Sequence, residues 1–218
     1  MTLDHLVREP DGEPQGALIL NHGRGTSEHD LYPLLDELDP ARRLVGVTPG
    51  APLTNIPPGG RHWYVVPRVG YPDPATFASS YTALTSFCDG FLDERGIGWD
   101  RTVIGGFSMG AVMSYAAGLG EARPSTAAII ALSGFIPTVE GWTADLDRPG
   151  LPVWIAHGRR DPVIGVEFGE AARDALTAAG AEVTYREHEG AHHVDPRALA
   201  DLPAWVERAV EAAPATAP

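Results

Sequence analysis

Ser108 lies in a segment whose residue types suit a catalytic nucleophile. The apolar run Thr102-Val103-Ile104 leads into Gly106-Phe107-Ser108-Met109-Gly110, and an apolar helical pattern follows. A serine at a sharp turn from a strand into a helix presses its neighbours together, so the positions on either side favour glycine. We therefore predict Ser108 as the nucleophile. The backbone N–H of Met109, at the start of the helix, is a predicted donor to an oxyanion.

A carboxylate and an imidazole that could activate Ser108 follow two later apolar runs. Asp161 stands in His157-Gly158-Arg159-Arg160-Asp161-Pro162, where Pro162 stiffens the turn. His192 follows Gly190, a residue that can bend the chain toward the sheet edge. The order serine, aspartate, histidine predicts a triad in which His192 is the base and Asp161 orients it. His193 or His188 as the base, and Asp161 as a helix cap, are the alternatives.

An earlier strand predicts the other half of an oxyanion hole. The run Leu18-Ile19-Leu20 ends in Asn21-His22-Gly23-Arg24-Gly25, a turn of the His-Gly-x-Gly type. The predicted donor is the backbone N–H of Arg24, so the side chain at that position can vary. His22 is predicted to hold the loop by hydrogen bonds rather than to act as a base.

The histidines near the C-terminal end also permit a metal site. His188 and His192 are four residues apart, and His193 and Asp195 are close to them in sequence. A helix would be needed to bring the pair together, and Gly190 between them argues against one. We therefore predict no metal and no cofactor. The single cysteine, Cys88, lies in an apolar run and is predicted to be a buried small hydrophobic residue.

Short apolar runs alternate with longer segments of helical spacing, which predicts βαβ units and a mostly parallel central sheet with helices on both faces. The predicted strands are Gly16–Asn21, Arg43–Val47, Thr102–Gly106, Ala127–Ser133, Val153–His157 and Glu182–Arg186. The predicted helices are Asp30–Leu38, Ala75–Arg95, Met109–Gly118, Val166–Ala179 and Pro196–Glu211. One domain over residues 1–211 is expected, followed by a disordered tail over residues 212–218.

Two long loops, over residues 49–73 and 137–149, have neither a strand pattern nor a helix pattern. They are predicted to form the rim of a pocket, and solvated connections without a function are the alternative. Apolar residues on the first of these loops and beyond strand ends are candidates for the wall of an acyl pocket, although packing in the core is the alternative for each. These candidates are Trp63, Tyr64, Phe135, Ile136, Val163 and Ile164.

The composition argues against several classes of partner. The formal net charge of −13 would repel nucleic acid and anionic lipid headgroups. The N-terminal residues resemble no signal peptide, and no apolar run reaches the roughly 18 residues of a membrane span. We expect a cytoplasmic protein that binds a small-molecule substrate without inserting into a membrane. For its assembly, a monomer and a homodimer are the alternatives.

Together these segments resemble the phospholipase/carboxylesterase family of the α/β-hydrolase fold, which includes bacterial carboxylesterases and acyl-protein thioesterases. The resemblance extends over nearly the whole chain, and Gly59-Gly60-Arg61-His62-Trp63-Tyr64 is similar to a further motif of the family. It implies a cofactor-free Ser-His-Asp hydrolase of short- to medium-chain esters or acyl thioesters. One departure is Met109, where the family usually has glutamine; it weakens the inference about substrate more than the inference about mechanism.

Three other functions share parts of this pattern. A lactonase similar to dienelactone hydrolases has a comparable layout but typically carries a cysteine nucleophile, which Ser108 argues against. A peptidase would use the same triad and oxyanion hole. A binding protein that keeps the fold without turnover is the alternative from outside the enzymes.

Overall fold

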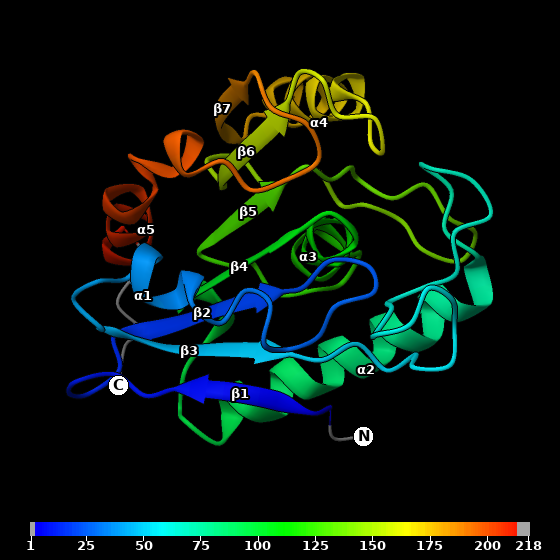
Figure 1. Cartoon of the computed structure of the whole chain (residues 1–218). Coiled ribbons are helices and arrows are strands. Elements are labelled where there is room, and N and C mark those ends of the chain that lie inside the picture. The colour runs from blue at the N-terminus through cyan, green and yellow to red at the C-terminus, as the bar shows by residue number, and fades with distance from the viewer. Residues whose placement is uncertain (1–2, 213–218) are drawn as a thin grey trace.

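The computed structural model describes residues 3–212. Their strands form one seven-stranded sheet in the order β1-β3-β2-β4-β5-β6-β7 (Figure 1). All neighbouring strands are parallel except β1, which pairs antiparallel with β3. The strands are β1 (His5–Arg8), β2 (Gly16–Asn21), β3 (Leu44–Pro49), β4 (Thr102–Phe107), β5 (Ala128–Leu132), β6 (Pro152–Gly158) and β7 (Glu182–His188). The prediction of a mostly parallel sheet is confirmed.

Strand β1 has no counterpart among the predicted strands. It has four residues, of which only Arg8 is buried, so it lacks the apolar run that marks the central strands. A buried ion pair fixes it instead: Nη2 of Arg8 lies 2.6 Å from Oδ2 of Asp39. The same nitrogen donates to the carbonyl oxygen of Leu44 at the start of β3.

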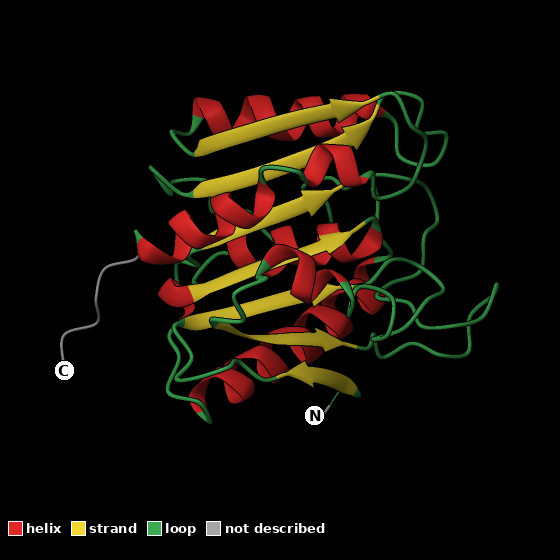
Figure 2. Cartoon of the chain, turned by 60° about the vertical axis from the view of Figure 1, so that its left-hand side comes forward, coloured by secondary structure: helices red, strands yellow, loops and turns green. Residues whose placement is uncertain are grey.

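The helices cover both faces of the sheet, as predicted (Figure 2). Residues of α2 (Pro74–Asp93), α3 (Met109–Leu119) and α4 (Val166–Ala178) belong to one apolar cluster. The opposite face is covered by α1 (Leu34–Leu38) and α5 (Leu202–Glu211). Short 3-10 helices cover Trp99–Arg101 and Pro196–Leu199.

Two helices begin several residues later than the sequence predicted. Helix α1 begins only at Leu34, after Pro33 at its N-cap, instead of at residue 30. The predicted helix Pro196–Glu211 is divided into the 3-10 turn and α5, which starts afresh after Asp201. In each case the helix begins beside a proline instead of carrying it in its interior, because a proline lacks the N–H that a helix interior needs. Of the predicted tail, Ala212 follows α5 in a turn, and residues 213–218 lie outside the described part.

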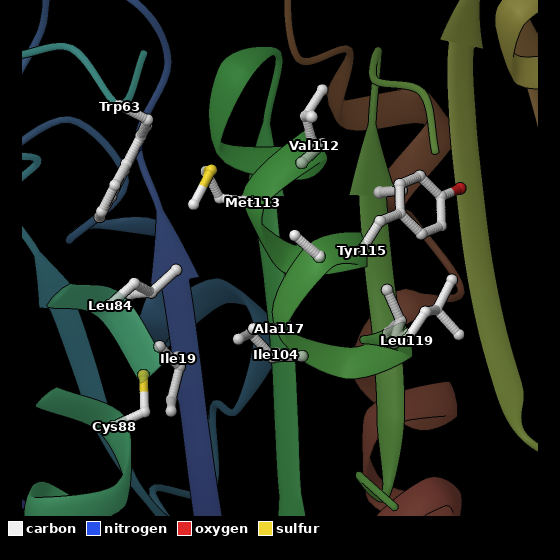
Figure 3. Packing of buried hydrophobic residues seen from close by; sticks show 14 of the residues in the cluster. Ile19, Trp63, Leu84, Cys88, Ile104, Val112, Met113, Tyr115, Ala117 and Leu119 are labelled. Carbon is white, nitrogen blue, oxygen red and sulfur yellow. The ribbon is translucent and has the colours of Figure 1, made fainter. Parts of the chain in front are cut away.

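The core between the sheet and α2 and α3 is closely packed (Figure 3). Ile19 of β2 lies beside Leu84 and Cys88 of α2, and Ile104 of β4 lies beside Ala117 of α3; all five side chains are fully buried. Burial raises the pKa of the Cys88 thiol, which confirms the prediction of a buried apolar residue. This layer holds α3, and therefore its first residue, at a fixed place above the sheet.

Within residues 3–212, no helix combines the length with the apolar character that a membrane crossing requires.

Candidate functional site

Ser108 occupies a strained turn between β4 and α3. Its backbone has φ 55° and ψ −119°, a combination that non-glycine residues rarely adopt. The N–H of Ser108 donates to the carbonyl oxygen of Leu132 at the end of β5, with 2.8 Å between nitrogen and oxygen. A Cβ at Gly110 would overlap the backbone oxygens of Asn21 and His22, so the turn requires glycine at that position. These constraints lift the Ser108 side chain above the carboxyl edge of the sheet.

The imidazole of His192 lies beside that hydroxyl. Its Nε2 is 2.8 Å from Oγ of Ser108, although Ser108 follows the central strand β4 and His192 follows the edge strand β7. The ring is mostly buried, and the ring of Phe107 packs against it with 4.8 Å between centroids. Of the three candidate bases, the structure brings His192 to the serine.

Asp161 lies behind the imidazole, on the turn after β6. Its Oδ2 is 2.6 Å from Nδ1 of His192, and its Oδ1 accepts the backbone N–H groups of Val163 and Ile164. A carboxylate can only accept here, so the His192 proton is on Nδ1 and the Nε2 lone pair faces Ser108. Burial alone would raise the pKa of Asp161, but the hydrogen bonds from His192 and the two amides outweigh it and lower that pKa.

The Asp161 carboxylate does not cap a helix, because the N-cap of α4 is Gly165.

His157 supports this acid turn, a role that was not predicted from the sequence. The side chain is fully buried at the end of β6, and its Nε2 lies 2.9 Å from the carbonyl oxygen of Ile164. Because a carbonyl oxygen only accepts, Nε2 of His157 carries the proton. The bond closes the turn that holds Asp161. A histidine directly before Gly158 at a strand's end was the available signal.

The turn after β2 presents a second backbone donor. Nε2 of His22 accepts the N–H of Ala51, so the ring proton is on Nδ1, which lies 2.6 Å from the carbonyl oxygen of Gly23. Burial is the main cause that lowers the pKa of His22 and favours its neutral form. Within the described residues, neither the N–H of Arg24 nor that of Met109 has a hydrogen-bond acceptor. Both amides are therefore available to a ligand.

A cavity of about 290 Å³ opens at Ser108 and His192. Four of the six predicted wall residues line it, namely Tyr64, Phe135, Val163 and Ile164. Trp63 is instead fully buried behind the turn, where its indole N–H donates to the carbonyl oxygen of His22. Ile136 packs against the core cluster. Val66, Val69 and Phe107 also line the cavity and were not predicted as wall residues, because no motif fixes the residue types at these positions.

The two long loops differ in their relation to this cavity. The loop over residues 49–73 contributes Tyr64, Val66, Arg68 and Val69. The loop over residues 137–149 contributes none of the described lining residues. It is held at the far end of α3 by backbone bonds, including the one from Asp145 to Leu119. Only the first loop forms the rim that was predicted for both.

The two other candidate bases, His188 and His193, form a separate cluster with Asp195. His188, His193 and Asp195 each place one possible ligand atom within 4.8 Å of the others. Two of these side chains already have partners: Nδ1 of His188 accepts the N–H of Gly190, and the Asp195 carboxylate binds Arg197. The first partner occupies an imidazole lone pair, and the second offsets the negative charge that would attract a cation.

The chain is similar to known proteins over most of its length. The model of the family described as Phospholipase/Carboxylesterase matches residues 3–209. The acyl-protein thioesterase 1 homolog 1 of Dictyostelium discoideum is 25% identical over 192 residues, with 84% of this chain and 85% of the relative covered. The esterase YpfH of Escherichia coli K12 is 28% identical, with 91% and 85% covered.

Two solved structures are similar along almost their whole length. The crystal structure of esterase PE8 has a TM-score of 0.84 and 25% identity, covering 95% of this chain and 99% of that one. The carboxylesterase of Bacillus cereus has a TM-score of 0.81 and 21% identity, covering 95% and 94%. These matches confirm the predicted α/β-hydrolase fold.

Proposed function

Because the chain belongs to the phospholipase/carboxylesterase family and is an ester hydrolase, we propose that it cleaves short- to medium-chain carboxylic esters or acyl thioesters through an acyl-enzyme. Ser108 is the nucleophile, His192 the general base and Asp161 the group that orients it. The observation that carries this proposal is the unbroken pair of hydrogen bonds from Asp161 through His192 to Ser108. It uses no metal and no cofactor.

In the first step, Nε2 of His192 takes the proton of Ser108 while the serine oxygen attacks the substrate carbonyl carbon. The imidazolium then gives that proton to the leaving alkoxide or thiolate, and the C–O or C–S bond breaks. Water repeats the sequence on the acyl-enzyme and releases the carboxylic acid with free Ser108. The Asp161 carboxylate stabilises the imidazolium in both halves of the reaction.

The two free amides support the assignment of an oxyanion hole to Arg24 and Met109. Each would donate to the oxygen that becomes negative as the serine attacks, and such a donor contributes about 3 kcal/mol to the transition state. The side chain of Met109 has a different partner, because its thioether sulfur accepts the N–H of Trp63 at 3.2 Å. That contact joins the start of α3 to the loop over residues 49–73.

The size and walls of the cavity support a short acyl chain. A volume of about 290 Å³ is at the lower end of small-molecule sites, and the side chains of Tyr64, Phe135 and Ile164 make much of its surface apolar. A short alkyl chain gains from this burial, whereas a long chain would extend past the rim.

A fluorophosphonate probe tests the nucleophile directly. We expect it to label wild-type protein at Ser108 and to leave Ser108→Ala unlabelled, with a loss of kcat on the order of 10⁶ for a short aryl ester. Ser86, exposed on α2, provides a matched control, because Ser86→Ala removes a hydroxyl far from the cavity. Wild-type turnover by Ser108→Ala would end the proposal.

A panel of substrates then separates the bond classes. Aryl esters of rising acyl length should show a maximum in kcat/KM at short chains, and an acyl thioester and a lactone of matched size would be measured beside them. A lactone hydrolysed much faster than every open ester would move the assignment to a lactonase. Labelling at Ser108 without turnover of any substrate would favour a binding protein.

A further inference from the structure

The arginines of this acidic chain are almost all paired. Within residues 3–212, all but four of their side chains lie within 4.0 Å of a carboxylate oxygen. The four exceptions are Arg24, Arg68, Arg101 and Arg208. With 29 acidic residues against 16 basic ones, a guanidinium without a carboxylate is unusual here.

Two of these four arginines have an evident structural role. Arg101 donates to the carbonyl oxygen of Gly96 at 2.9 Å, before β4 begins. Arg208 lies in the last turn of α5, where a cation stabilises the helix end. The other two, Arg24 and Arg68, line the cavity at Ser108, although they come from loops far apart in the sequence.

Both cavity arginines keep most of their N–H groups unused. Arg24 makes one side-chain bond, from Nη2 to the carbonyl oxygen of Pro57 at 3.3 Å. The guanidinium carbon of Arg68 lies 3.7 Å from the centre of the Tyr71 ring, and within residues 3–212 this side chain makes no hydrogen bond. Both side chains are exposed. A guanidinium offers five donors, so each of these can still bind an anion with two parallel hydrogen bonds.

Asp30 is the acidic side chain on the described lining of this cavity. Its Oδ2 accepts the hydroxyl of Thr26 at 3.1 Å, and it lies beyond 4.0 Å of both arginines. The charged side chains that face the cavity are therefore two cations and one anion, in a protein whose net charge is −13. This local reversal of sign attracts a small anion to a site that the rest of the surface would repel.

We propose that the substrates are small esters or thioesters carrying a carboxylate or another compact anionic group, which Arg24 and Arg68 bind at the rim while the apolar wall holds the rest. The inference rests on the proposed ester hydrolysis at Ser108. The anionic group can belong to the acyl chain or to the alcohol, and the two cases require separate substrates. In either case the two arginine side chains determine specificity and take no part in bond making, whereas the backbone N–H of Arg24 keeps its proposed place in the oxyanion hole.

Matched pairs of aryl butyrates and adipates test the proposal. For the alcohol side, 3-carboxyphenyl butyrate is compared with 3-carbamoylphenyl butyrate. For the acyl side, the 4-nitrophenyl monoester of adipic acid is compared with that of adipamic acid, after subtraction of the uncatalysed rate. The two members of each pair differ in charge but hardly in shape. We expect kcat/KM to favour the carboxylate by about tenfold in at least one pair, mainly through KM.

Arg68→Gln should lower that carboxylate-to-amide ratio by about tenfold, whereas Arg208→Gln, which removes an unpaired guanidinium far from the cavity, should leave it unchanged. The ratio is taken within each variant, so partial unfolding lowers both rates and does not affect it. Raising the salt concentration to about 1 M should also reduce the ratio by screening.

The results distinguish this inference from the function on which it rests. The inference would be overturned if Ser108 cleaved the ester bond of the two neutral, carbamoyl-bearing substrates and the carboxylate-to-amide ratio of kcat/KM were one or below in both pairs. The esterase proposal would stand. A high ratio that survives Arg68→Gln and Arg24→Gln together would also overturn the inference. Failure of wild-type protein to hydrolyse any of the four esters would remove the esterase proposal itself, and this inference with it.

Discussion

Ser108 and His192 meet at 2.8 Å, but they come from regions that are built differently. The nucleophile elbow, residues 106–110, lies between a central strand and a helix whose residues are all buried. The histidine loop, residues 188–195, follows the edge strand β7, most of whose residues are only half-buried. One partner of the hydrogen bond is therefore held in the core and the other at the margin of the sheet.

The means of support differ accordingly. Steric contact holds the elbow, since Gly110 leaves no room for a Cβ against the backbone of β2. Hydrogen bonds hold the histidine loop: the N–H of Arg159 donates to the carbonyl oxygen of His188, and that of Arg160 to the carbonyl oxygen of Gly190. These donors directly precede Asp161. The acid turn thus positions the loop through its backbone and the ring through its carboxylate, and a mutation can separate the two effects.

The largest expected difference is between the two side chains that serve Ser108. His192→Ala should lower kcat by a factor on the order of 10⁶, because no other basic side chain within residues 3–212 contacts the hydroxyl. Asp161→Asn should cost about 10⁴, because the amide no longer fixes the proton on Nδ1 while the bonds from Arg159 and Arg160 still hold the loop. Steady-state kinetics on one aryl ester measures both. Equal losses would mean that the loop itself depends on the carboxylate.

A smaller effect separates the two glycines of these regions. Gly110→Ala forces a Cβ into backbone oxygens that cannot move, and we expect a loss of about 3 kcal/mol or more in the free energy of unfolding. At Gly190 the Cβ would meet the side chains of His188 and His193, of which His193 is exposed and free to turn away. Gly190→Ala should cost about 1 kcal/mol.

Urea unfolding of both variants measures this difference. Comparable losses would show that the histidine loop is packed as rigidly as the elbow, which contradicts its half-exposed edge position.

The same contrast explains what the sequence could predict. Steric requirements appear as residue types at fixed spacing, so Gly106, Ser108 and Gly110 mark the elbow in the sequence itself. The strands are marked in the same way, because buried parallel strands are continuous apolar runs. Asp161 and His192 also follow from their order and their place after strands, but the choice between His192 and His193 depends on a loop conformation that spacing does not determine.

Other features that depend on hydrogen bonds between distant segments are marked by no motif and could not be predicted. Strand β1 is held by Arg8 reaching Asp39 and Leu44, and no local pattern records such a contact. Trp63 stands next to Tyr64 in the sequence, yet Tyr64 lines the cavity while the indole of Trp63 points to the carbonyl oxygen of His22. Which of two neighbouring aromatic residues faces a cavity is decided by partners elsewhere in the chain.

The smallest expected effect concerns the buried histidine beside the elbow. Burial lowers the pKa of His22 in the folded protein, whereas the unfolded chain binds a proton at about pH 6.5. The neutral ring therefore stabilises the fold fully above that pH, and its contribution is lost as the pH falls through the folded pKa.

Between pH 7.5 and 5.5, wild-type protein should lose about 1 kcal/mol more of its free energy of unfolding than His22→Gln does. Urea unfolding of both proteins at the two pH values measures this, and His188, whose pKa is lowered mainly by burial as well, is present in both and cancels. If the two proteins lost equal stability, the turn that presents the Arg24 amide would not be held by a neutral imidazole, and the elbow side of the site would be less rigid than its packing implies.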